Sequence, residues 1–262
     1  MANKIYGINP LQVEGSNFET GYGHSKFVKF KINNKEMMPI FSANANVFGS
    51  NREDRTKEKV FCQIKEEKNS LNLYARTSGL NFPRWIGGAP TFRIGEGVWG
   101  PQSGLKFKQI KNYKKIQTSI EFNHLIKKGF SDFSYDIWLT KETHPANIFE
   151  TTREEDVEIM ITLNSNFKFP WTKLEENENF IVLYEDKNKN PLARDKGHCI
   201  CFIQKKKINK FDILELINLC SKYLKKDLSK HYLRSFDLIN EFAKNTETIA
   251  KITKLRIDLI EK

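Results

Sequence analysis

Residues 156–163 read Asp-Val-Glu-Ile-Met-Ile-Thr-Leu, and this stretch decides the class of fold. Its apolar residues recur at a period of two, which is typical of a β-strand with one buried face. That apolar set is Val157, Ile159, Ile161 and Leu163. On the second face Glu158 stands beside Met160, where a plain sandwich strand would carry Lys, Thr or Ser. A carboxylate fixed on a rigid strand in a half-apolar surface is a candidate for ligand binding or chemistry.

The stretch before it, residues 131–140, reads Ser-Asp-Phe-Ser-Tyr-Asp-Ile-Trp-Leu-Thr and alternates in the same way. One of its faces is apolar, whereas the other places Asp136 beside Trp138. A polar loop over 141–155 joins the two stretches. We therefore expect them to pair as antiparallel strands, with Asp136 and Glu158 on one face.

Most of the remaining chain also consists of short alternating segments separated by turn signals, which is typical of a β-sandwich or barrel. Further strands are expected at 26–32, 40–48, 59–65, 70–76, 106–111, 115–123, 180–185, 198–204, 231–242 and 248–260. Residues 80–105 are rich in Gly, Pro and Trp and are expected to form ordered loops. One amphipathic helix is expected over 211–224, where apolar residues recur at helical spacing. No internal repeat or interdomain linker is visible, so residues 1–262 are expected to form a single domain.

The chain is basic, with 43 Lys and Arg against 32 Asp and Glu and a formal net charge of +11. Such a charge can mark a nucleic-acid-binding surface. Here the basic residues are spread along the chain in short clusters, and no helix-turn-helix, RNP-like or zinc-finger pattern accompanies them. We interpret the charge as a solvated surface and expect no nucleic-acid partner, while a basic nucleic-acid-binding β-domain stays as an alternative.

Cysteine and histidine spacing predicts no metal site, because no C-x-x-C motif or Cys/His zinc spacing occurs. Four cysteines are expected to be buried free thiols: Cys62, Cys199, Cys201 and Cys220. No apolar run is long enough for a signal peptide or a transmembrane helix. The chain as written is expected to be cytoplasmic and away from membranes, although a trimmed leader would leave the same sequence, so export stays open.

Four of the expected strands carry polar and aromatic side chains on the face opposite the core. These side chains are Asn44, Asn46 and Phe48; Asp136 and Trp138; Glu158 and Met160; and Asp237 and Glu241. Carboxylates mixed with aromatic rings suit carbohydrate, because sugars stack their C–H faces on rings and pair their hydroxyls with carboxylates. Paired carboxylates also cleave glycosidic bonds. The pattern by itself is compatible with a hydrolase and with a non-catalytic jelly-roll carbohydrate-binding protein.

The run Ser-Tyr-Asp-Ile-Trp-Leu at 134–139, followed by Val-Glu-Ile-Met-Ile at 157–161, resembles the paired signature of glycoside hydrolase family 12. These enzymes are the small endo-β-glucanases, or cellulases. Residues 236–242, Phe-Asp-Leu-Ile-Asn-Glu-Phe, resemble the family's acid/base segment at about the family's distance from the nucleophile. Two weaker similarities are Asn-Val-Phe-Gly at 46–49 to its Asn-x-Trp-Gly cleft motif, and residues 82–88 to its Tyr-Pro-x-x-x-x-Gly segment.

This resemblance implies an all-β jelly-roll sandwich of two antiparallel sheets, with a concave substrate cleft and one helix on the convex side. It implies a retaining endo-β-1,4-glucanase in which Glu158 is the nucleophile, Glu241 is the acid/base and Asp136 holds Glu158 in position. The side chains that it assigns to substrate binding are Asn46, Phe48, Trp85, Trp138 and Met160. It implies no metal or cofactor, and a monomer that binds a β-glucan polysaccharide or oligosaccharide.

Three departures from the family pattern bear on the substrate. Thr162 stands where the family often has Trp, Phe48 replaces the usual cleft Trp, and Ile239-Asn240 replaces a small Gly-Ser/Thr pair. Cellulose, mixed-linkage glucan, xyloglucan and short oligosaccharides therefore all stay open as substrates. The charge and the lack of a leader are also unusual for a family that is mostly secreted.

Overall fold

The computed structural model describes residues 59–66, 70–78, 87–96, 98, 106–142, 152–189 and 196–262. For residues 65 and 66, and for six strands near the N-terminus, it describes the backbone alone. These six strands are β1 (Lys4–Ile8), β2 (Val13–Glu14), β3 (Phe27–Val28), β4 (Lys31–Ile32), β5 (Lys35–Glu36) and β6 (Phe41–Asn46).

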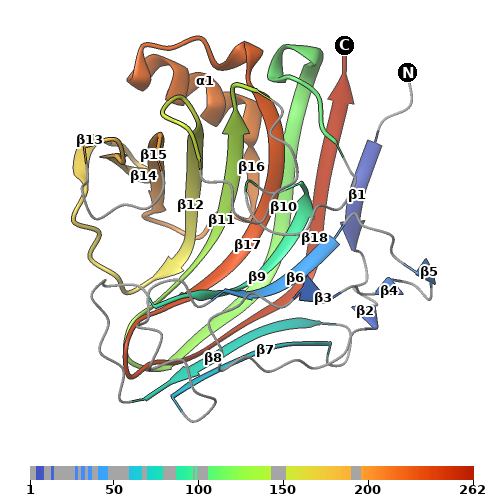
Figure 1. The fold of residues 1–262 in the computed structure, drawn as a ribbon, viewed down its shortest axis with the longest axis vertical. Helices are drawn as coiled ribbons and strands as arrows, with labels where there is room; N and C mark the ends of the chain where they lie inside the picture. Colours follow the sequence, from blue (N-terminus) through green and yellow to red (C-terminus); the bar gives the residue numbers. More distant parts are fainter. Residues whose placement is uncertain are drawn as a thin grey trace.

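Two curved sheets stacked face to face make up most of the described structure (Figure 1). The six-stranded sheet runs in the order β16 (Lys210–Asp212), β10 (Tyr113–Lys128), β18 (Glu247–Glu261), β8 (Leu71–Thr77) and β7 (Val60–Glu66), with β1 paired to β18. The nine-stranded sheet runs in the order β13 (Thr172–Glu176), β14 (Phe180–Asp186), β15 (His198–Gln204), β12 (Val157–Ser165), β11 (Ser131–Thr140), β17 (Tyr232–Phe242), β9 (Ala89–Gly95), β6 and β3. Strands β2, β4 and β5 form a small third sheet. The expected jelly-roll sandwich is confirmed.

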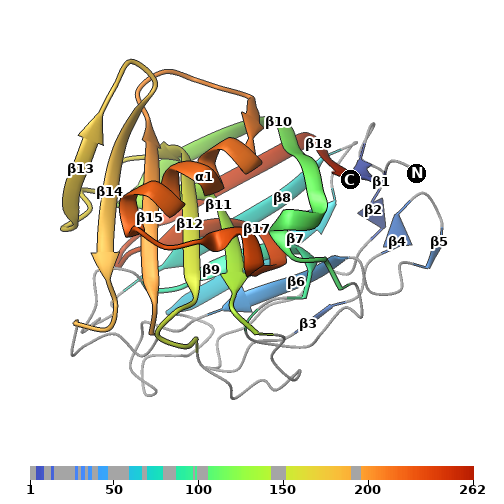
Figure 2. The same cartoon turned by 90° about the horizontal axis from the view of Figure 1, so that it is seen from above.

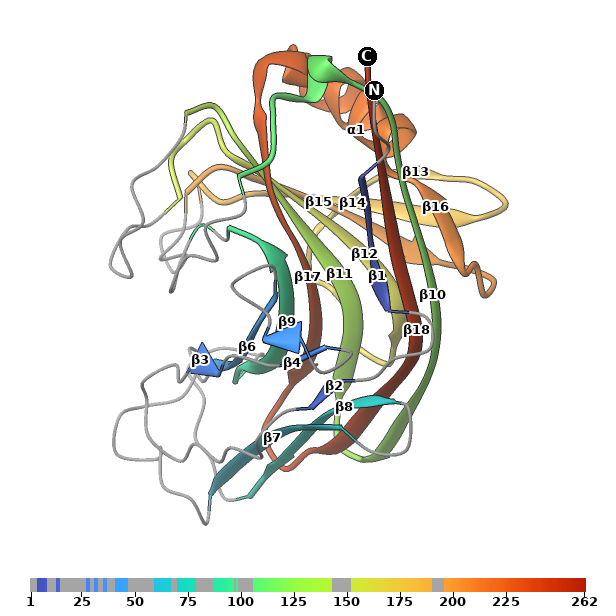
Figure 3. The same ribbon diagram turned by 90° about the vertical axis from the view of Figure 1, so that its right-hand side faces the viewer.

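The two layers lie side by side in Figure 3, where the nine-stranded sheet curves so that its outer face is concave. The core lies between the layers and takes the apolar set of each alternating strand, including Val157, Ile159 and Ile161, none of which is exposed. The opposite side chains of the same strands therefore line the concave face. Burial of the apolar set forces the polar set of the same strands onto one common surface.

The one α-helix of the described residues, α1 (Ile213–Leu224), confirms the amphipathic segment. The Asp212 carboxylate caps its first turn by accepting a hydrogen bond from the Glu215 backbone N–H at 3.1 Å. Its buried residues, Ile213, Leu216, Ile217 and Cys220, join the core cluster between the sheets. The helix therefore packs on the convex side of the nine-stranded sheet, at one end of the sandwich (Figure 2).

One pair of strands departs from the expected antiparallel arrangement. The predicted antiparallel pairing of 131–140 with 156–163 is confirmed by β11 and β12. In contrast, β12 and β15 pair in parallel. The chain leaves β12 for the sheet edge, and β13, β14 and β15 then return strand by strand toward it. This crossover brings β15 beside β12 in the same direction.

Strand β9 corrects the expectation that residues 80–105 form only loops. Every residue of β9 is buried, and the strand pairs with β17 on one side and β6 on the other. Phe92 and Ile94 join the core, so Thr91 and Arg93 lie on the concave face. Pro and Gly usually indicate loops, and β9 contains Pro90 and ends at Gly95, so the composition of this segment did not indicate a strand.

Loss of core volume at β12 should destabilise the fold. Ile159→Ala removes a fully buried side chain, and we expect it to lower the free energy of unfolding by about 2–5 kcal/mol through lost burial and a residual cavity. Urea denaturation followed by circular dichroism measures the change. Leu174→Ala, at a residue that is 39% exposed, is the control and should change it by less than about 0.5 kcal/mol. Equal losses in the two variants would contradict the assigned core.

Candidate active site

Strand β11 sits between the two strands that carry the candidate glutamates. Trp138 of β11 lies opposite Glu158 of β12, and Asp132 of β11 lies opposite Glu241 of β17. Asp136 lies between these two levels on the same face of β11. The pleat thus directs carboxyl groups from three adjacent strands to the concave face: Glu158 from β12, Asp132 and Asp136 from β11, and Glu241 from β17.

Glu158 forms a buried ion pair that the sequence pattern does not reveal. Its carboxylate accepts a hydrogen bond from the ammonium group of Lys187, which lies in the turn after β14. The side chains of Lys187 and Glu158 are 9% and 12% exposed. The Lys187 Nζ also lies 4.9 Å from the centre of the Trp138 ring, in a cation–π contact. The carboxylate is therefore held between strand β12 and the β14–β15 turn.

Asp136 is a neighbour of Glu158 with a perturbed carboxyl group. The Trp138 indole Nε1 donates a hydrogen bond to its Oδ2 at 3.0 Å. No N–H or hydroxyl group of the described residues donates to its Oδ1, and its carboxyl group lies within hydrogen-bonding reach of Glu158. Burial raises the pKa of Asp136 well above its usual range, and the carboxylates of Glu158 and Asp237 raise it further. Asp136 therefore favours its protonated form.

Glu241 lies in a similar environment on the other side of β11. It is buried, and its Oε2 has no hydrogen-bond partner in the described part of the chain. Burial raises the pKa of Glu241 well above its usual range, and the negative charges of Asp132 and Glu158 raise it further. Burial likewise raises the pKa of Asp132 to about 7, against the opposing effect of a hydrogen bond from the Ser134 hydroxyl. The electrostatic influence of Glu158 on Glu241 means that the two carboxyl groups share one site.

Asp237 belongs to the same face but is already engaged by Arg93. The Arg93 guanidinium donates to both carboxylate oxygens, from Nε to Oδ1 at 2.9 Å and from Nη2 to Oδ2 at 2.6 Å. Both residues are buried. This bidentate geometry couples β9 to β17 and leaves Asp237 as an ion-pair partner.

Sequence searches against family models and against curated proteins found no match for this chain. Solved structures match it over nearly its whole length. A native family 12 xyloglucanase from Bacillus licheniformis superposes with a TM-score of 0.67 at 16% identity, covering 95% of this chain and 100% of that one. This protein has the glycoside hydrolase family 12 fold.

Two further solved structures agree with that assignment. Endoglucanase Cel12A from Rhodothermus marinus gives a TM-score of 0.61 at 16% identity, covering 82% of this chain and 92% of its own. Endoglucanase 3 of family 12 from Trichoderma harzianum gives a TM-score of 0.61 at 10% identity, covering 95% of this chain and 97% of its own. Since the identities are low, the likeness establishes the family 12 fold, and the chemistry must be argued from the side chains of this chain.

The expected substrate contacts divide into two groups. Trp138 and Met160 lie on the concave face and are 1% and 3% exposed, Trp138 beneath Lys187 and Met160 in an apolar cluster with Cys199 and Cys201. The backbone of Asn46 ends β6 opposite Ala89, and its side chain lies outside the described residues. Phe48 and Trp85 also lie outside them.

Three charged residues of the site were missed by reasoning from the sequence. Arg93 alternates with two core residues in the segment 90–94, and that alternation was a usable signal. Asp132 shares the polar face of Asp136 in the same alternating strand and was equally visible. Lys187 comes from a turn rich in Asp, Lys and Asn, and nothing in that composition indicated a buried side chain.

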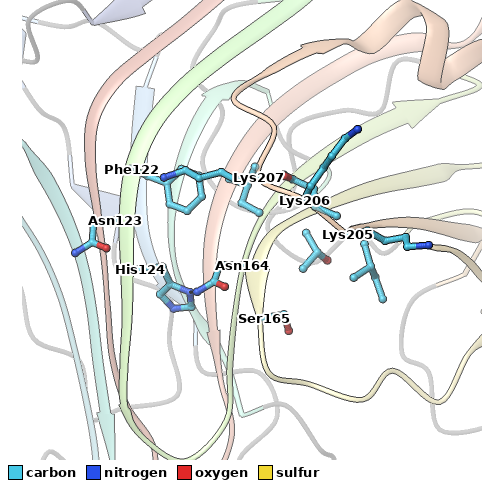
Figure 4. Close-up of a pocket in the computed structure, with 12 residues that line it drawn as sticks. Phe122, Asn123, His124, Asn164, Ser165, Lys205, Lys206 and Lys207 are labelled. Atoms are coloured by element: carbon cyan, nitrogen blue, oxygen red, sulfur yellow. Dashed lines mark hydrogen bonds between the residues drawn. The ribbon is translucent and has the colours of Figure 1, made fainter. Parts of the chain in front are cut away.

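A cavity of about 380 Å³ lies apart from the three candidate carboxyl groups, between β10, the end of β12 and residues 203–207 (Figure 4). His124 lines it and is committed to neighbours, with its Nε2 2.8 Å from the Thr248 hydroxyl and its Nδ1 3.1 Å from the Asn164 amide nitrogen. Burial lowers the pKa of His124 to about 4, so its ring is neutral. Lys207 lies over the Phe122 ring, with its Nζ 4.9 Å from the ring centre. None of the three candidate carboxyl groups lines the cavity, but two of its lining residues, Thr162 and Ser165, hydrogen-bond the neighbouring Asp132 carboxyl group.

Within the described ranges, the four cysteines are free and buried, as expected. No helix of those ranges has the length and apolarity needed to cross a bilayer. No cluster of three or more His, Cys, Asp or Glu side chains suited to a metal ion occurs in them.

The Arg93–Asp237 pair should be essential for the stability of the concave face. Arg93→Met leaves the Asp237 carboxylate buried without its bidentate partner, so we expect a loss of about 3–5 kcal/mol in the free energy of unfolding. Lys254→Met breaks the exposed ion pair with Glu121 and is the control, with an expected change below about 1 kcal/mol. Chemical denaturation of both variants measures the difference, and similar losses would refute the role given to Arg93.

Proposed function

We propose that this protein is a retaining endo-β-1,4-glucanase and that residues 1–262 form one catalytic domain. The observation that carries the proposal is the placement of Glu158 and Glu241 on the two strands that flank β11, on the concave face of a family 12 fold. Retaining glycosidases need two carboxyl groups on opposite sides of the scissile bond. The ligand of this site would be a β-glucan polysaccharide or oligosaccharide, since the structural neighbours are described as endoglucanases and xyloglucanases.

In the first step the Glu158 carboxylate attacks the anomeric carbon. The bond from that carbon to the leaving oxygen breaks, and Glu241 transfers its proton to the leaving oxygen. In the second step Glu241, now a carboxylate, takes a proton from water, and the resulting hydroxide displaces Glu158 from the sugar. Two inversions at one carbon return the original β configuration.

The environments of the two glutamates support this division of roles. The Lys187 ammonium contacts Glu158 and stabilises a carboxylate, which is the form that a nucleophile needs. Burial and the nearby Asp132 raise the pKa of Glu241, which keeps it protonated as a general acid requires. Asp136, Trp138 and Met160 complete the floor of the site in this proposal, together with Asn46, Phe48 and Trp85. Asp136 acts there by holding Glu158.

Product analysis tests the proposed reaction. Purified protein should release reducing ends from at least one of cellulose, mixed-linkage glucan and xyloglucan, and proton NMR should detect the β-anomer first. An initial α-anomer would exclude Glu158 as a nucleophile. Binding of the polymer without any reducing ends would instead favour a non-catalytic carbohydrate-binding protein.

Rescue by azide separates the two glutamates. We expect Glu158→Ala and Glu241→Ala each to lose at least about 10²–10⁴-fold in kcat/KM on polymer. With an aryl β-glycoside, whose leaving group needs no acid, azide can replace Glu158 from the α face and yield the α-glycosyl azide. In Glu241→Ala azide attacks the glycosyl-enzyme instead and yields the β-glycosyl azide. Mass spectrometry and NMR identify the products, and exchanged outcomes would reverse the two roles.

The basic limb of the pH–activity profile should report the ionisation of Glu241. The negative charge of Asp132 raises the pKa of Glu241, so Asp132→Asn should lower it and move the basic limb of kcat/KM to lower pH. Asp258→Asn, which removes a carboxylate on β18 of the other sheet, is the matched control and should leave the limb in place. A basic limb that Asp132→Asn does not move would contradict Glu241 as the general acid.

A further inference from the structure

Lys187 is a buried lysine whose charged end lies inside the carboxylate site. Its Nζ contacts the Glu158 carboxylate and the face of the Trp138 ring, and the residue is 7% exposed. A buried ammonium group is costly unless it is paired and hydrogen-bonded. This placement therefore needs a specific reason in the surrounding structure.

The turn that carries Lys187 is tied to the segment leading into β12. The Lys187 backbone N–H donates to the Gly197 carbonyl at 3.1 Å, and the Asn188 side chain donates to the Glu154 carbonyl at 3.3 Å. Gly197 has a φ of +97°, and a Cβ there would lie 2.3 Å from the Asp156 carbonyl oxygen. Only glycine fits this close approach. These contacts hold the turn against the backbone just before Glu158, because Asp156 precedes Glu158 by two residues. The turn therefore holds Lys187 next to the Glu158 carboxylate.

Among the described residues, the other titratable groups that face Glu158 are acids. Asp136 faces it from β11, Glu241 from β17, and the thiols of Cys199 and Cys201 from β15. Arg93, a second buried cation on this face, is held by Asp237. Lys187 thus supplies the positive charge at Glu158 itself.

The carboxyl groups of Asp136 and Glu158 lie on adjacent strands and interact directly, and two like charges in contact favour one shared proton. The contacts of the two groups differ. Lys187 contacts Glu158, whereas Asp136 receives the Trp138 N–H at Oδ2 and has its carboxyl group within hydrogen-bonding reach of Glu158. The ammonium group stabilises the negative charge on Glu158, and Asp136 is left to carry the proton.

We propose that Lys187 is a positioning residue that assigns the negative charge of the Asp136–Glu158 pair to Glu158. Its catalytic meaning rests on the proposed function, because only a nucleophile requires that ionisation. When Glu158 forms the bond to the anomeric carbon, its charge disappears, while Lys187 keeps its proton and its contact with the Trp138 ring. The ion pair therefore favours the free enzyme over the glycosyl-enzyme and assists the second step.

The first test reads the ionisation directly and does not depend on activity. Protein labelled with ¹³C at the glutamate carboxyl groups is titrated by NMR, and the Glu158 signal is identified by its loss in Glu158→Gln. In Lys187→Met the titration midpoint of that signal should rise by about 1–3 pH units, because an adjacent positive charge is removed. Lys187→Gln, which keeps a hydrogen-bond donor but no charge, should show the same rise and serves if the Met variant does not fold.

Two variants provide matched controls. Lys189→Met removes the lysine two positions further along the same turn, whose side chain is 85% exposed and paired with Asp186. It should leave the midpoint in place, and Lys187→Arg should preserve most of the native value. An unchanged midpoint in both Lys187→Met and Lys187→Gln would overturn the proposal and leave Lys187 as a packing residue.

The second test connects the charge to catalysis. The acidic limb of the kcat/KM profile should move to higher pH in Lys187→Met by the same interval as the NMR midpoint, and stay in place in Lys189→Met. A shift in the NMR midpoint without a shift in the limb would overturn the catalytic part. If the native protein hydrolyses no β-glucan, the proposed function fails, while the NMR titration still decides whether Lys187 controls the charge of Glu158.

Discussion

The pairing of β11 with β12 on one side and β17 on the other determines most of what this molecule can do. The apolar side chains of each of these strands pack between the sheets. Because side chains alternate along a strand, the remaining side chains lie on the concave face. A one-residue slip in either register would exchange core and site residues. The same hydrophobic burial that stabilises the fold therefore places Asp136, Glu158 and Glu241 on one surface.

Concentrating carboxyl groups on a buried surface has an electrostatic cost, and the buried cations Arg93 and Lys187 offset part of it. Arg93 pairs with Asp237 and couples β9 to β17, while Lys187 pairs with Glu158 and couples the β14–β15 turn to β12. Asp132, Asp136 and Glu241 have no such partner in the described residues, and burial shifts each toward the protonated form. The result is one face on which neighbouring carboxyl groups differ in charge, which acid–base chemistry at a single bond requires.

Much of the fold could be predicted from the sequence, because a strand with one buried face repeats every two residues and a helix every three to four. Strands β11 and β12, helix α1 and the antiparallel pairing of β11 with β12 followed from those periods. Strand β9 was missed, since Pro90 and Gly95 obscure a short segment that is buried on both faces. The parallel pairing of β15 with β12 was missed too, because it depends on a crossover through the sheet edge.

By itself the sequence determined which side chains share a face of each strand, and hence that Asp136, Glu158 and Glu241 were candidates. Only the tertiary structure decided which strands are neighbours and which charges meet. Backbone hydrogen bonds between strands are the same for nearly every residue, so local sequence contains little information about the partner of a distant strand. Lys187 illustrates the point, because its contact with Glu158 depends on a glycine turn and a parallel strand pair that no local pattern encodes.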